Sequence, residues 1–589
     1  MKQFFKTVFA SMIGAFLSIL LLIFLGVLVL VGSIMSLSKE DKVEVKEHSI
    51  IQINLNEPIT ERGNDYPFNF SSVMNFNVEQ SLGLDEILAS IKKASTDPNI
   101  DGIYLDISGV SAGLSTTEEI RNALLKFKES NKFIYAYSEY YTQKGYYLAS
   151  VADSIFLNPS GLLELKGVNA QYMFFQHALE KLEITPEIIR VGSFKSAVEP
   201  YMSDHMSDSN RLQTNVYLSS LFGHMIKNIA SSRKLNNDST YAIATKLKVR
   251  NAEDAVTYKL ADALIYKDEL LQKFAKNTSQ SSINDIRFIS LKKYNKSSPA
   301  DVTISKNKIA IIYANGEIVS GDGDENSMGS EKISRAIRKA RLDADVKSIV
   351  LRVNSPGGSA LASDVIWREM ILAKKDKPVI VSMGDVAASG GYYIACAADT
   401  IVAEPTTITG SIGVFGVLFN AQKFFNNKLG ITFDQVKIGE YADLGDYTKP
   451  LSPAERMIIQ NEINRIYNDF TSKVAEGRKM PQENVKRIAE GRVWSGIDAK
   501  RIGLVDVLGN IDDAVKIAAN KAKLTEYRIV NYPELEDPFE KIIKQLGGNV
   551  KAYLMPNEYK ELAPYLKTLE SMKNNKGIQA RLPLNFQID

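Results

Sequence analysis

A serine at a glycine-flanked turn is the first candidate for chemistry in this sequence. Ser389 stands in Met383-Gly-Asp-Val-Ala-Ala-Ser-Gly-Gly391, after an apolar run typical of a strand and before a helical pattern. Such a strand-to-helix turn exposes the side chain to substrate and places it near the positive end of the helix. The hydroxyl is therefore a candidate nucleophile, although a serine in this place can also simply cap the helix.

A serine hydroxyl attacks only after a base has removed its proton. The usual base is histidine, but all four histidines fall in the first half of the chain, in polar settings: His48, His177, His205 and His224. Lys195, in Val191-Gly-Ser-Phe-Lys-Ser-Ala-Val-Glu-Pro200, is the alternative. Burial disfavours the charged form of a lysine and lowers its pKa toward neutrality, so a buried Lys195 can act as the base.

The neighbours of Lys195 act in opposite directions on its charge. Phe194, Ala197 and Val198 can supply apolar cover, whereas Glu199 would favour the protonated amine. A solvated surface charge is the ordinary role of a lysine, so the sequence around Lys195 does not by itself establish a base.

Two glycine-rich turns complete the candidate site. Asn354-Ser-Pro-Gly-Gly358 follows a strand-like run, and its glycines let backbone N–H groups approach a developing oxyanion closely. Gly357 and Gly358 are the candidate oxyanion site, with a plain turn as the alternative. Ser411, in Thr409-Gly-Ser-Ile-Gly413, lies 22 residues beyond Ser389 and is a candidate to orient the lysine. An ordinary turn serine is its alternative.

The sequence contains two similar copies of the elements that must position these residues. Gly145–Ile155 matches Gly391–Ile401 at seven of eleven positions with an offset of 246. Further segments pair at the same offset: Ile103–Ile107 with Ile349–Val353, Phe133–Tyr137 with Val379–Met383, and Ile87–Ala94 with Ile333–Ala340. Each copy alternates β-branched runs with helical patterns, which predicts an α/β fold of tandem duplicated domains with a mostly parallel sheet.

The chemistry-bearing residues are divided between the two copies. Gln143 occupies the position of Ser389 in the first copy, and Ala442 lies opposite Lys195 in the second copy. The first copy also lacks the paired glycines of the oxyanion loop. We therefore expect one Ser–Lys pair, assembled across the two halves.

Composition excludes several classes of protein. The 589 residues suggest about four units at roughly 150 residues each. The net charge is only +2, which gives no electrostatic reason to expect a nucleic acid partner. Cys396 is the single cysteine, and motifs for zinc proteases, nucleotides and dinucleotides are absent, so we expect no metal and no cofactor.

The N-terminal segment predicts a membrane anchor. No charged residue occurs between Lys6 and Lys39, and the apolar run is long enough for a helix to cross a bilayer core. Its length exceeds the apolar core of an ordinary signal peptide, although Gly32 and Ser33 leave cleavage as an alternative. Lys2 and Lys6 favour a cytoplasmic N-terminus and an exported remainder.

The expected domain order follows from these patterns. Residues 1–38 are the anchor, 39–300 the first repeat domain with Lys195, 301–535 the second repeat domain with Ser389, and 536–589 a C-terminal extension. The first copy carries an insert around Arg62–Asn77, and we expect the connection between the copies in the polar stretch from Asn277 to Pro299. The tail after Tyr532 is interpreted as peripheral helix and extension.

Together these motifs resemble the long form of bacterial signal peptide peptidases, the protease IV type. The similarity covers nearly the whole chain, and Asp385, where a small residue is expected, is a mild departure. The resemblance implies a Clp-protease/crotonase-like fold and a membrane-bound Ser–Lys endopeptidase with Ser389 as nucleophile, Lys195 as general base and Gly357–Gly358 as oxyanion site. It further implies a homotetramer at the inner membrane that degrades released signal peptides on the periplasmic side.

Three other functions are alternatives for a chain with these features. The first is a non-catalytic, membrane-anchored scaffold, and the second is a crotonase-type enzyme acting on acyl thioesters. A Ser-His-Asp hydrolase is the third, but its turn G-x-S-x-G requires glycine where Ala387 stands. The expected partners remain apolar peptides, the lipid bilayer and further copies of the chain.

Overall fold

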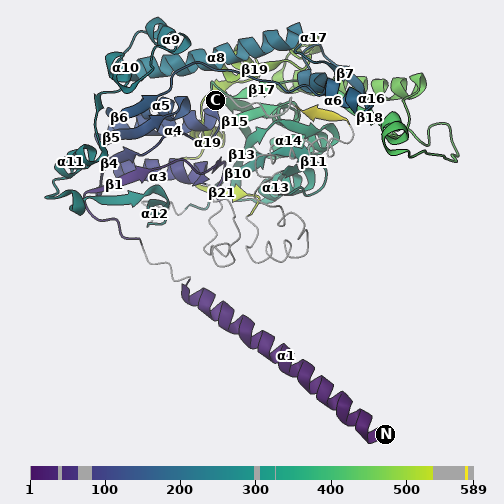
Figure 1. The fold of residues 1–589 in the computed structure, drawn as a ribbon, viewed down its shortest axis with the longest axis horizontal. Coiled ribbons are helices and arrows are strands. Elements are labelled where there is room, and N and C mark those ends of the chain that lie inside the picture. Colours follow the sequence, from purple (N-terminus) through teal and green to yellow (C-terminus); the bar gives the residue numbers. More distant parts are fainter. Residues whose placement is uncertain are drawn as a thin grey trace.

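Two α/β halves lie side by side in the molecule (Figure 1). The structure is a computed structural model of the chain, and it describes residues 2–37, 43–63, 82–297, 305–324, 327–534 and 578–581. Each half contains a central sheet built from the apolar β-branched runs of the sequence, with helices packed on it.

The first sheet has the strand order β8-β6-β5-β4-β1-β9, and all of its pairings are parallel. Helices connect successive parallel strands, as the repeating pattern predicted. The strands are β1 (Ser49–Ile53), β4 (Ile100–Leu105), β5 (Phe133–Tyr141), β6 (Ser154–Leu163), β8 (Ala263–Leu264) and β9 (Arg287–Ser290).

The second sheet repeats this arrangement, since β15-β13-β10-β21 follows the same order as β5-β4-β1-β9. Its pairings are parallel except that of β17 with β19. The strands are β10 (Lys308–Asn315), β13 (Val346–Ser355), β15 (Val379–Ala388), β16 (Thr400–Ala403), β17 (Ile408–Gly410), β19 (Val493–Ser495), β20 (Val507–Leu508) and β21 (Arg528–Tyr532). The tandem α/β organisation with mostly parallel sheets is therefore confirmed.

A third sheet, in the order β12-β11-β14-β22-β18-β7, joins the two halves. In it β7 of the first half runs antiparallel to β18 of the second, from Val191 opposite Val414 to Thr185 opposite Asn420. Its strands are β7 (Thr185–Val191), β11 (Glu317–Val319), β12 (Ser327–Gly329), β14 (Gly357–Ser359), β18 (Val414–Asn420) and β22 (Gln579–Arg581). A separate pair is formed by β2 (Ile59–Thr60) and β3 (Leu82–Gly83).

Helix α8 runs across the top of both halves in Figure 1. Its residues Tyr217 and Leu221 pack against Ala388 and Val493 of the second half. The helices of the first half are α3 (Leu84–Thr96), α4 (Leu114–Phe127), α5 (Gln143–Ala149), α6 (Gln176–Lys181), α7 (Glu199–Met202), α8 (Asp208–Arg233), α9 (Asn237–Thr245), α10 (Ala252–Thr257), α11 (Lys267–Asn277) and α12 (Leu291–Asn295). Those of the second are α13 (Ser330–Leu342), α14 (Ala360–Asp376), α15 (Gly390–Ala395), α16 (Pro453–Arg478), α17 (Gln482–Ile488), α18 (Gly496–Arg501) and α19 (Ile511–Lys521).

Buried polar groups fix the relative position of the halves. The Arg352 guanidinium on β13 donates to Glu61 at 2.8 Å and to Glu119 at 2.5 Å, and all three side chains are buried. Asp385 accepts from the amide and the hydroxyl of Thr116 at the start of α4. Because a buried charge without its partner is costly, this network resists any slip between the halves.

The terminal segments are described only in part. Helix α1 (Lys2–Leu37) stands apart from the sheets in Figure 1. Among the residues that the structure describes, no helix combines the length and apolar character needed to cross a bilayer. The anchor over residues 1–38 therefore stays a prediction.

Other expected segments differ from the prediction or fall on residues without a description. The connection expected between Asn277 and Pro299 contains β9, a strand of the first sheet, because Phe288 and Ile289 pair with β1. Most of the insert around Arg62–Asn77 lies outside the described residues. In the tail, Gln579–Arg581 form the strand β22, and the helix expected there falls on residues outside the described ones.

Candidate active site

Ser389 lies at the sharp turn between β15 and α15. Its backbone has φ 56° and ψ −114°, a conformation that costs a non-glycine residue on the order of 1–3 kcal/mol. The Ser389 amide donates to the Gly410 carbonyl at 2.8 Å, and its carbonyl accepts from the Tyr393 amide. The turn is thus fixed from both sides, with the serine side chain fully buried.

Lys195 reaches this turn from the other half of the molecule. The loop after β7 is tied to the second half by the Phe194 amide, which donates to the Glu490 carbonyl at 3.0 Å. Gln213 strengthens the tie, since it donates to the Phe194 carbonyl and accepts from the Val493 amide. Lys195 Nζ then lies 2.9 Å from Ser389 Oγ in a hydrogen bond.

The surroundings of Lys195 favour an uncharged amine. Its side chain is 0% exposed, and Nζ lies 5.9 Å from the centre of the Phe415 ring. Phe415 forms a small apolar cluster with Ala197 and Val198, two of the residues expected to give cover. Burial holds the pKa of Lys195 well below its ordinary value, because desolvation penalises the ammonium form.

The carboxylate expected to oppose this effect is engaged elsewhere. Glu199 accepts hydrogen bonds from the amide and hydroxyl of Ser207 and from Asn210. It therefore caps the start of α8 instead of pairing with the lysine.

Ser411, at the turn after β17, contacts the lysine. Lys195 Nζ donates to both the carbonyl and the hydroxyl of Ser411, each at 3.1 Å. Because an uncharged amine has two N–H groups, these two contacts engage both of them and leave the lone pair facing Ser389 Oγ. Ser411 is itself buried.

Two glycines make room for the lysine: Gly413, from the glycine-rich turn of Ser411, and Gly491, which the sequence motifs did not single out. A Cβ on Gly491 would lie 2.6 Å from Lys195 Cβ and 2.7 Å from its Cα, and the φ of Gly491 is +79°. A Cβ on Gly413 would lie 3.2 Å from Lys195 Cδ. Gly491 sits in Ala489-Glu-Gly-Arg492, which has no local signal for a site, because its contact with Lys195 is purely tertiary.

The glycine loop lies directly against the Ser389 turn. Gly357, with φ +100°, approaches so closely that a Cβ there would be 2.7 Å from the Gly390 amide nitrogen. Its own amide donates to Ser355 Oγ at 3.2 Å. The Ala360 amide donates to the Ile578 carbonyl, next to β22. Gly358 lies opposite Ala580 in the same antiparallel pairing, and residues two apart point their amides to the same side of a strand, so the Gly358 amide faces β22.

The Gly357 amide is thus engaged by Ser355, and Gly357 provides the close approach between the loop and the Ser389 turn. The Gly390 amide nitrogen lies next to this loop and directly after Ser389, and the sequence motifs did not single it out. The role of these glycines toward an oxyanion stays a prediction. The positive end of α15 adds to the favourable potential for an anion.

In the first half, Gln143 occupies the position that corresponds to Ser389. Gln143, at the start of α5, accepts from the amides of Lys166 and Gly167 at 3.0 and 3.1 Å and donates to the Gly167 carbonyl. Ala442, the counterpart of Lys195, lies on the exposed segment after β18. The described residues thus bring nucleophile and amine together in one place, between the copies.

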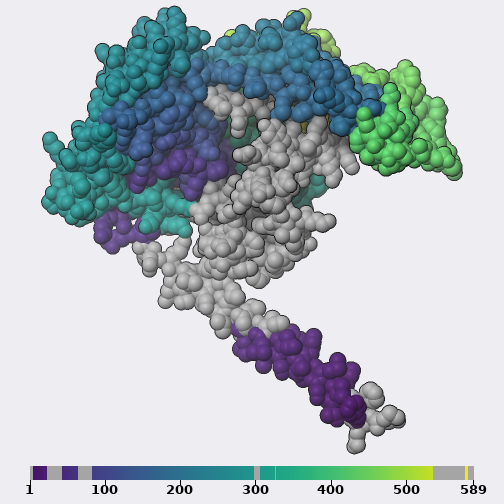
Figure 2. All heavy atoms as spheres, viewed as in Figure 1, coloured from purple at the N-terminus to yellow at the C-terminus, as the bar shows by residue number. Residues whose placement is uncertain are grey.

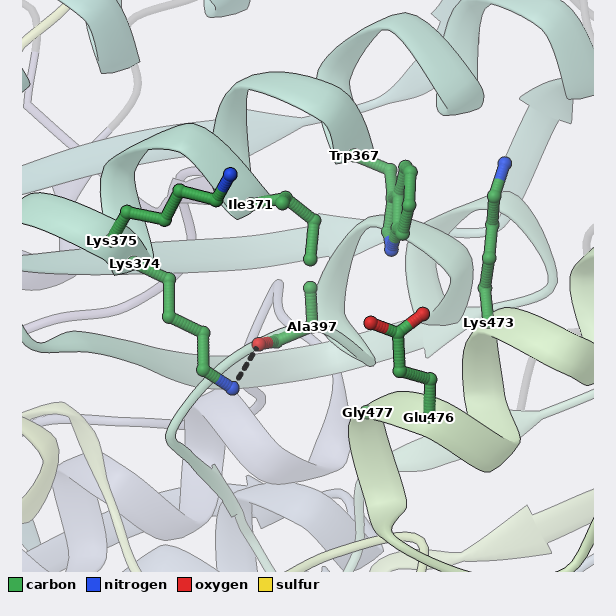
Figure 3. Close-up of a pocket in the computed structure, with 8 residues that line it drawn as sticks. All are labelled: Trp367, Ile371, Lys374, Lys375, Ala397, Lys473, Glu476 and Gly477. Carbon is green, nitrogen blue, oxygen red and sulfur yellow. Dashed lines mark hydrogen bonds between the residues drawn. The ribbon is translucent and has the colours of Figure 1, made fainter.

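A surface cavity of about 220 Å³ lies elsewhere, between α14 and α16 (Figure 3). Two of its cations are engaged by the chain itself: Lys374 donates to the Ala397 carbonyl (Figure 3), and Lys473 pairs with Asp364 beside the Trp367 ring. None of the candidate catalytic residues lines it. The lining residues are Trp367, Ile371, Lys374, Lys375, Ala397, Lys473, Glu476 and Gly477.

Comparison with known proteins gives consistent matches over both halves. The model of peptidase family S49 matches residues 126–281 and 371–525, and that of the Clp proteases matches residues 306–407. Protease 4 of Salmonella typhi is 37% identical over 82% of this chain and 79% of its own length. Protease 4 of Haemophilus influenzae is 34% identical over 84% of this chain and 83% of its own. The chloroplastic serine protease SPPA of Arabidopsis thaliana is 33% identical, covering 87% and 76%.

Proposed function

The chain belongs to peptidase family S49 and is a serine endopeptidase of the protease IV type, and on this premise we propose that Ser389 and Lys195 are its catalytic pair. The observation that carries the proposal is the 2.9 Å hydrogen bond between Lys195 Nζ and Ser389 Oγ. Membership of a peptidase family argues against the two alternatives, a non-catalytic scaffold and an acyl-thioester enzyme.

The contacts around the pair support a two-stage hydrolysis. The uncharged Lys195 amine takes the Ser389 proton as the oxygen attacks the peptide carbonyl. The amides of Gly358 and Gly390 stabilise the oxyanion, and Lys195 returns the proton to the leaving amine. A water molecule then hydrolyses the acyl-enzyme with the same lysine as base. Ser411 keeps the amine aimed at Ser389 Oγ through both stages.

A serine-reactive phosphonate probe tests this assignment. We expect labelling at Ser389 in the unmodified enzyme and none in Ser389→Ala or Lys195→Met. Ser348→Ala is the matched control, because Ser348 is a buried serine on β13 that donates to the Pro378 carbonyl. Full labelling of Lys195→Met at neutral pH would show that another group is the base.

Released signal peptides at the bacterial inner membrane are the substrate class that we propose. The uncharged run between Lys6 and Lys39 supports an anchor there, with the remainder on the periplasmic side. Such peptides are apolar and stay at the bilayer, so an anchored enzyme meets them in two dimensions. Protease added to intact, right-side-out inner-membrane vesicles would test the topology. It should digest the remainder of the chain and leave the N-terminal segment protected.

Self-association, with a homotetramer as the expected state, is supported by an apolar arm. The arm comprises residues 420–447 and protrudes at the right of Figure 2. Val436 and Ile438 on it are 99% and 97% exposed. Exposed apolar patches of this kind mark protein–protein contacts. The double variant Val436→Asp with Ile438→Asp should dissociate the oligomer, as measured by sedimentation velocity. Leu342→Asp also places a carboxylate at an exposed apolar position, but outside the arm, and should leave the oligomer intact.

A further inference from the structure

Gln213 on helix α8 connects the loop of the lysine to the other half of the molecule. Its side chain is 2% exposed and uses both ends of its amide. Oε1 accepts from the Val493 amide of β19 at 3.1 Å. Nε2 donates to the Phe194 carbonyl and to the Ser196 hydroxyl, each at 3.1 Å. Because Phe194 and Ser196 flank Lys195, a single amide holds the lysine loop against β19.

The orientation of this amide is fixed by its partners. A backbone N–H can only donate, so Val493 requires the oxygen of Gln213 to face β19 and the nitrogen to face the loop. Asn210, one turn earlier on α8, offers a further acceptor 3.2 Å from Nε2 and donates through its own nitrogen to Glu199. Asn210 and Glu199 are buried as well. A buried polar network whose members all have partners is rigid.

The strand that Gln213 contacts also supports the nucleophile. Val493 lies opposite Gly410 in the antiparallel pairing of β19 with β17. The Gly410 carbonyl accepts from the Ser389 amide at 2.8 Å. The serine turn and the lysine loop are therefore both positioned relative to β19, the turn through β17 and the loop through Gln213.

The corresponding helix of the second half lacks this amide. Helices α8 and α16 each have 26 residues and follow the capping serines Ser207 and Ser452. The residue six positions after the cap is Gln213 in α8 and Ile458 in α16, and Ile458 is 40% exposed. The amide thus occurs in the half that also carries Lys195, which favours a role connected with the lysine over a general role in this helix.

We propose that Gln213 is a positioning residue of the reaction, which holds Lys195 at hydrogen-bonding distance from Ser389 and keeps water away from the amine. This inference rests on the proposed roles of Ser389 and Lys195. Without the amide, the Phe194 carbonyl and the Val493 amide lose a buried partner, and the loop can move away from β19. A displacement of about 1 Å costs on the order of 100-fold in rate.

Gln213→Met tests the proposal, because methionine keeps the length of the side chain and removes the amide. Asn228→Leu is the matched control, since Asn228 also lies on α8 but donates to Tyr147 within the first half. On a fluorogenic apolar peptide we expect Gln213→Met to lower kcat about 100-fold with KM changed less than about twofold, and Asn228→Leu to keep both. Equal losses of kcat in the two variants would reflect a weakened helix and would overturn the proposal.

The pH dependence of kcat separates a positioning role from a structural one. Water beside a loosened loop would solvate the ammonium form of Lys195, which burial now disfavours. The pKa of Lys195 should therefore rise in Gln213→Met, and the acid limb of the profile should move to higher pH by about 0.5 unit or more. A structural loss would lower kcat equally at every pH. If kcat of folded Gln213→Met falls without this shift, Gln213 does not act through the lysine and the proposal is overturned.

Gln213→Asn provides the test if the methionine variant does not fold. Its amide is one methylene shorter and fits the site, but it cannot span from the loop to β19, so kcat should fall with the same shift in pH. A folded Gln213→Asn with the kcat and pH profile of the unmodified enzyme would overturn the proposal. Failure of the proposed function would look different: Ser389 of the unmodified enzyme would not react with the phosphonate probe, or Lys195→Met would cut the peptide at the normal rate.

Discussion

Replacing Gly491 by alanine would place a methyl group against the backbone of Lys195. The new Cβ would lie 2.6 Å from Lys195 Cβ and 2.7 Å from both its Cα and its amide nitrogen. Ordinary van der Waals contact begins near 3.4 Å, so the two segments must separate by about 0.8 Å. That movement lengthens the Lys195–Ser389 hydrogen bond beyond the roughly 3.2 Å that proton transfer in the ground state requires.

The expected cost is large in activity and modest in stability. A displacement of about 1 Å costs on the order of 100-fold in rate, which corresponds to about 2.7 kcal/mol. Alanine at the left-handed φ of Gly491 should also lower the free energy of unfolding by about 1–2 kcal/mol. Gly503→Ala is the matched control, because its φ is +84° and its nearest neighbour is the flexible end of Met480.

The assay is kcat/KM on a fluorogenic apolar peptide, combined with thermal unfolding of both variants. We expect the two variants to lose similar stability, and Gly491→Ala alone to lose activity and phosphonate labelling. If a folded Gly491→Ala cuts the peptide as fast as Gly503→Ala, the lysine does not need its observed position, and the reasoning is refuted.

Two further predictions concern the buried charged groups. Activity should fall as pH drops through the lowered pKa of Lys195. Lys195→Met should be more stable than the unmodified enzyme near neutral pH, because there only the unfolded lysine binds a proton, and the difference in unfolding free energy should narrow as pH rises. Arg352→Met should cost about 3–5 kcal/mol in urea unfolding by leaving two buried carboxylates unpaired, whereas Arg465→Met, on the exposed pair with Glu462, should cost at most about 1 kcal/mol.

Much of the candidate site could be predicted from the sequence because its signals are local. A serine between a strand and glycines predicts an exposed turn, and the offset of 246 between the copies shows which positions have changed. Comparison of the copies led to Lys195, since its counterpart Ala442 cannot act as a base. The α/β class and the parallel sheets follow from the alternating patterns in the same way.

The contacts across the halves could be decided only by the tertiary structure. The pairing of β7 with β18 carries Lys195 to Ser389, and no periodicity within either strand specifies that partner. Gly491 and Gln213 gain their roles from segments hundreds of residues away, so their own neighbours in sequence give no signal. The sequence determined which side chains can do chemistry, because reactivity belongs to residue type and local turn. Packing alone determined their distance, burial and charge state, because these depend on what the rest of the chain places around them.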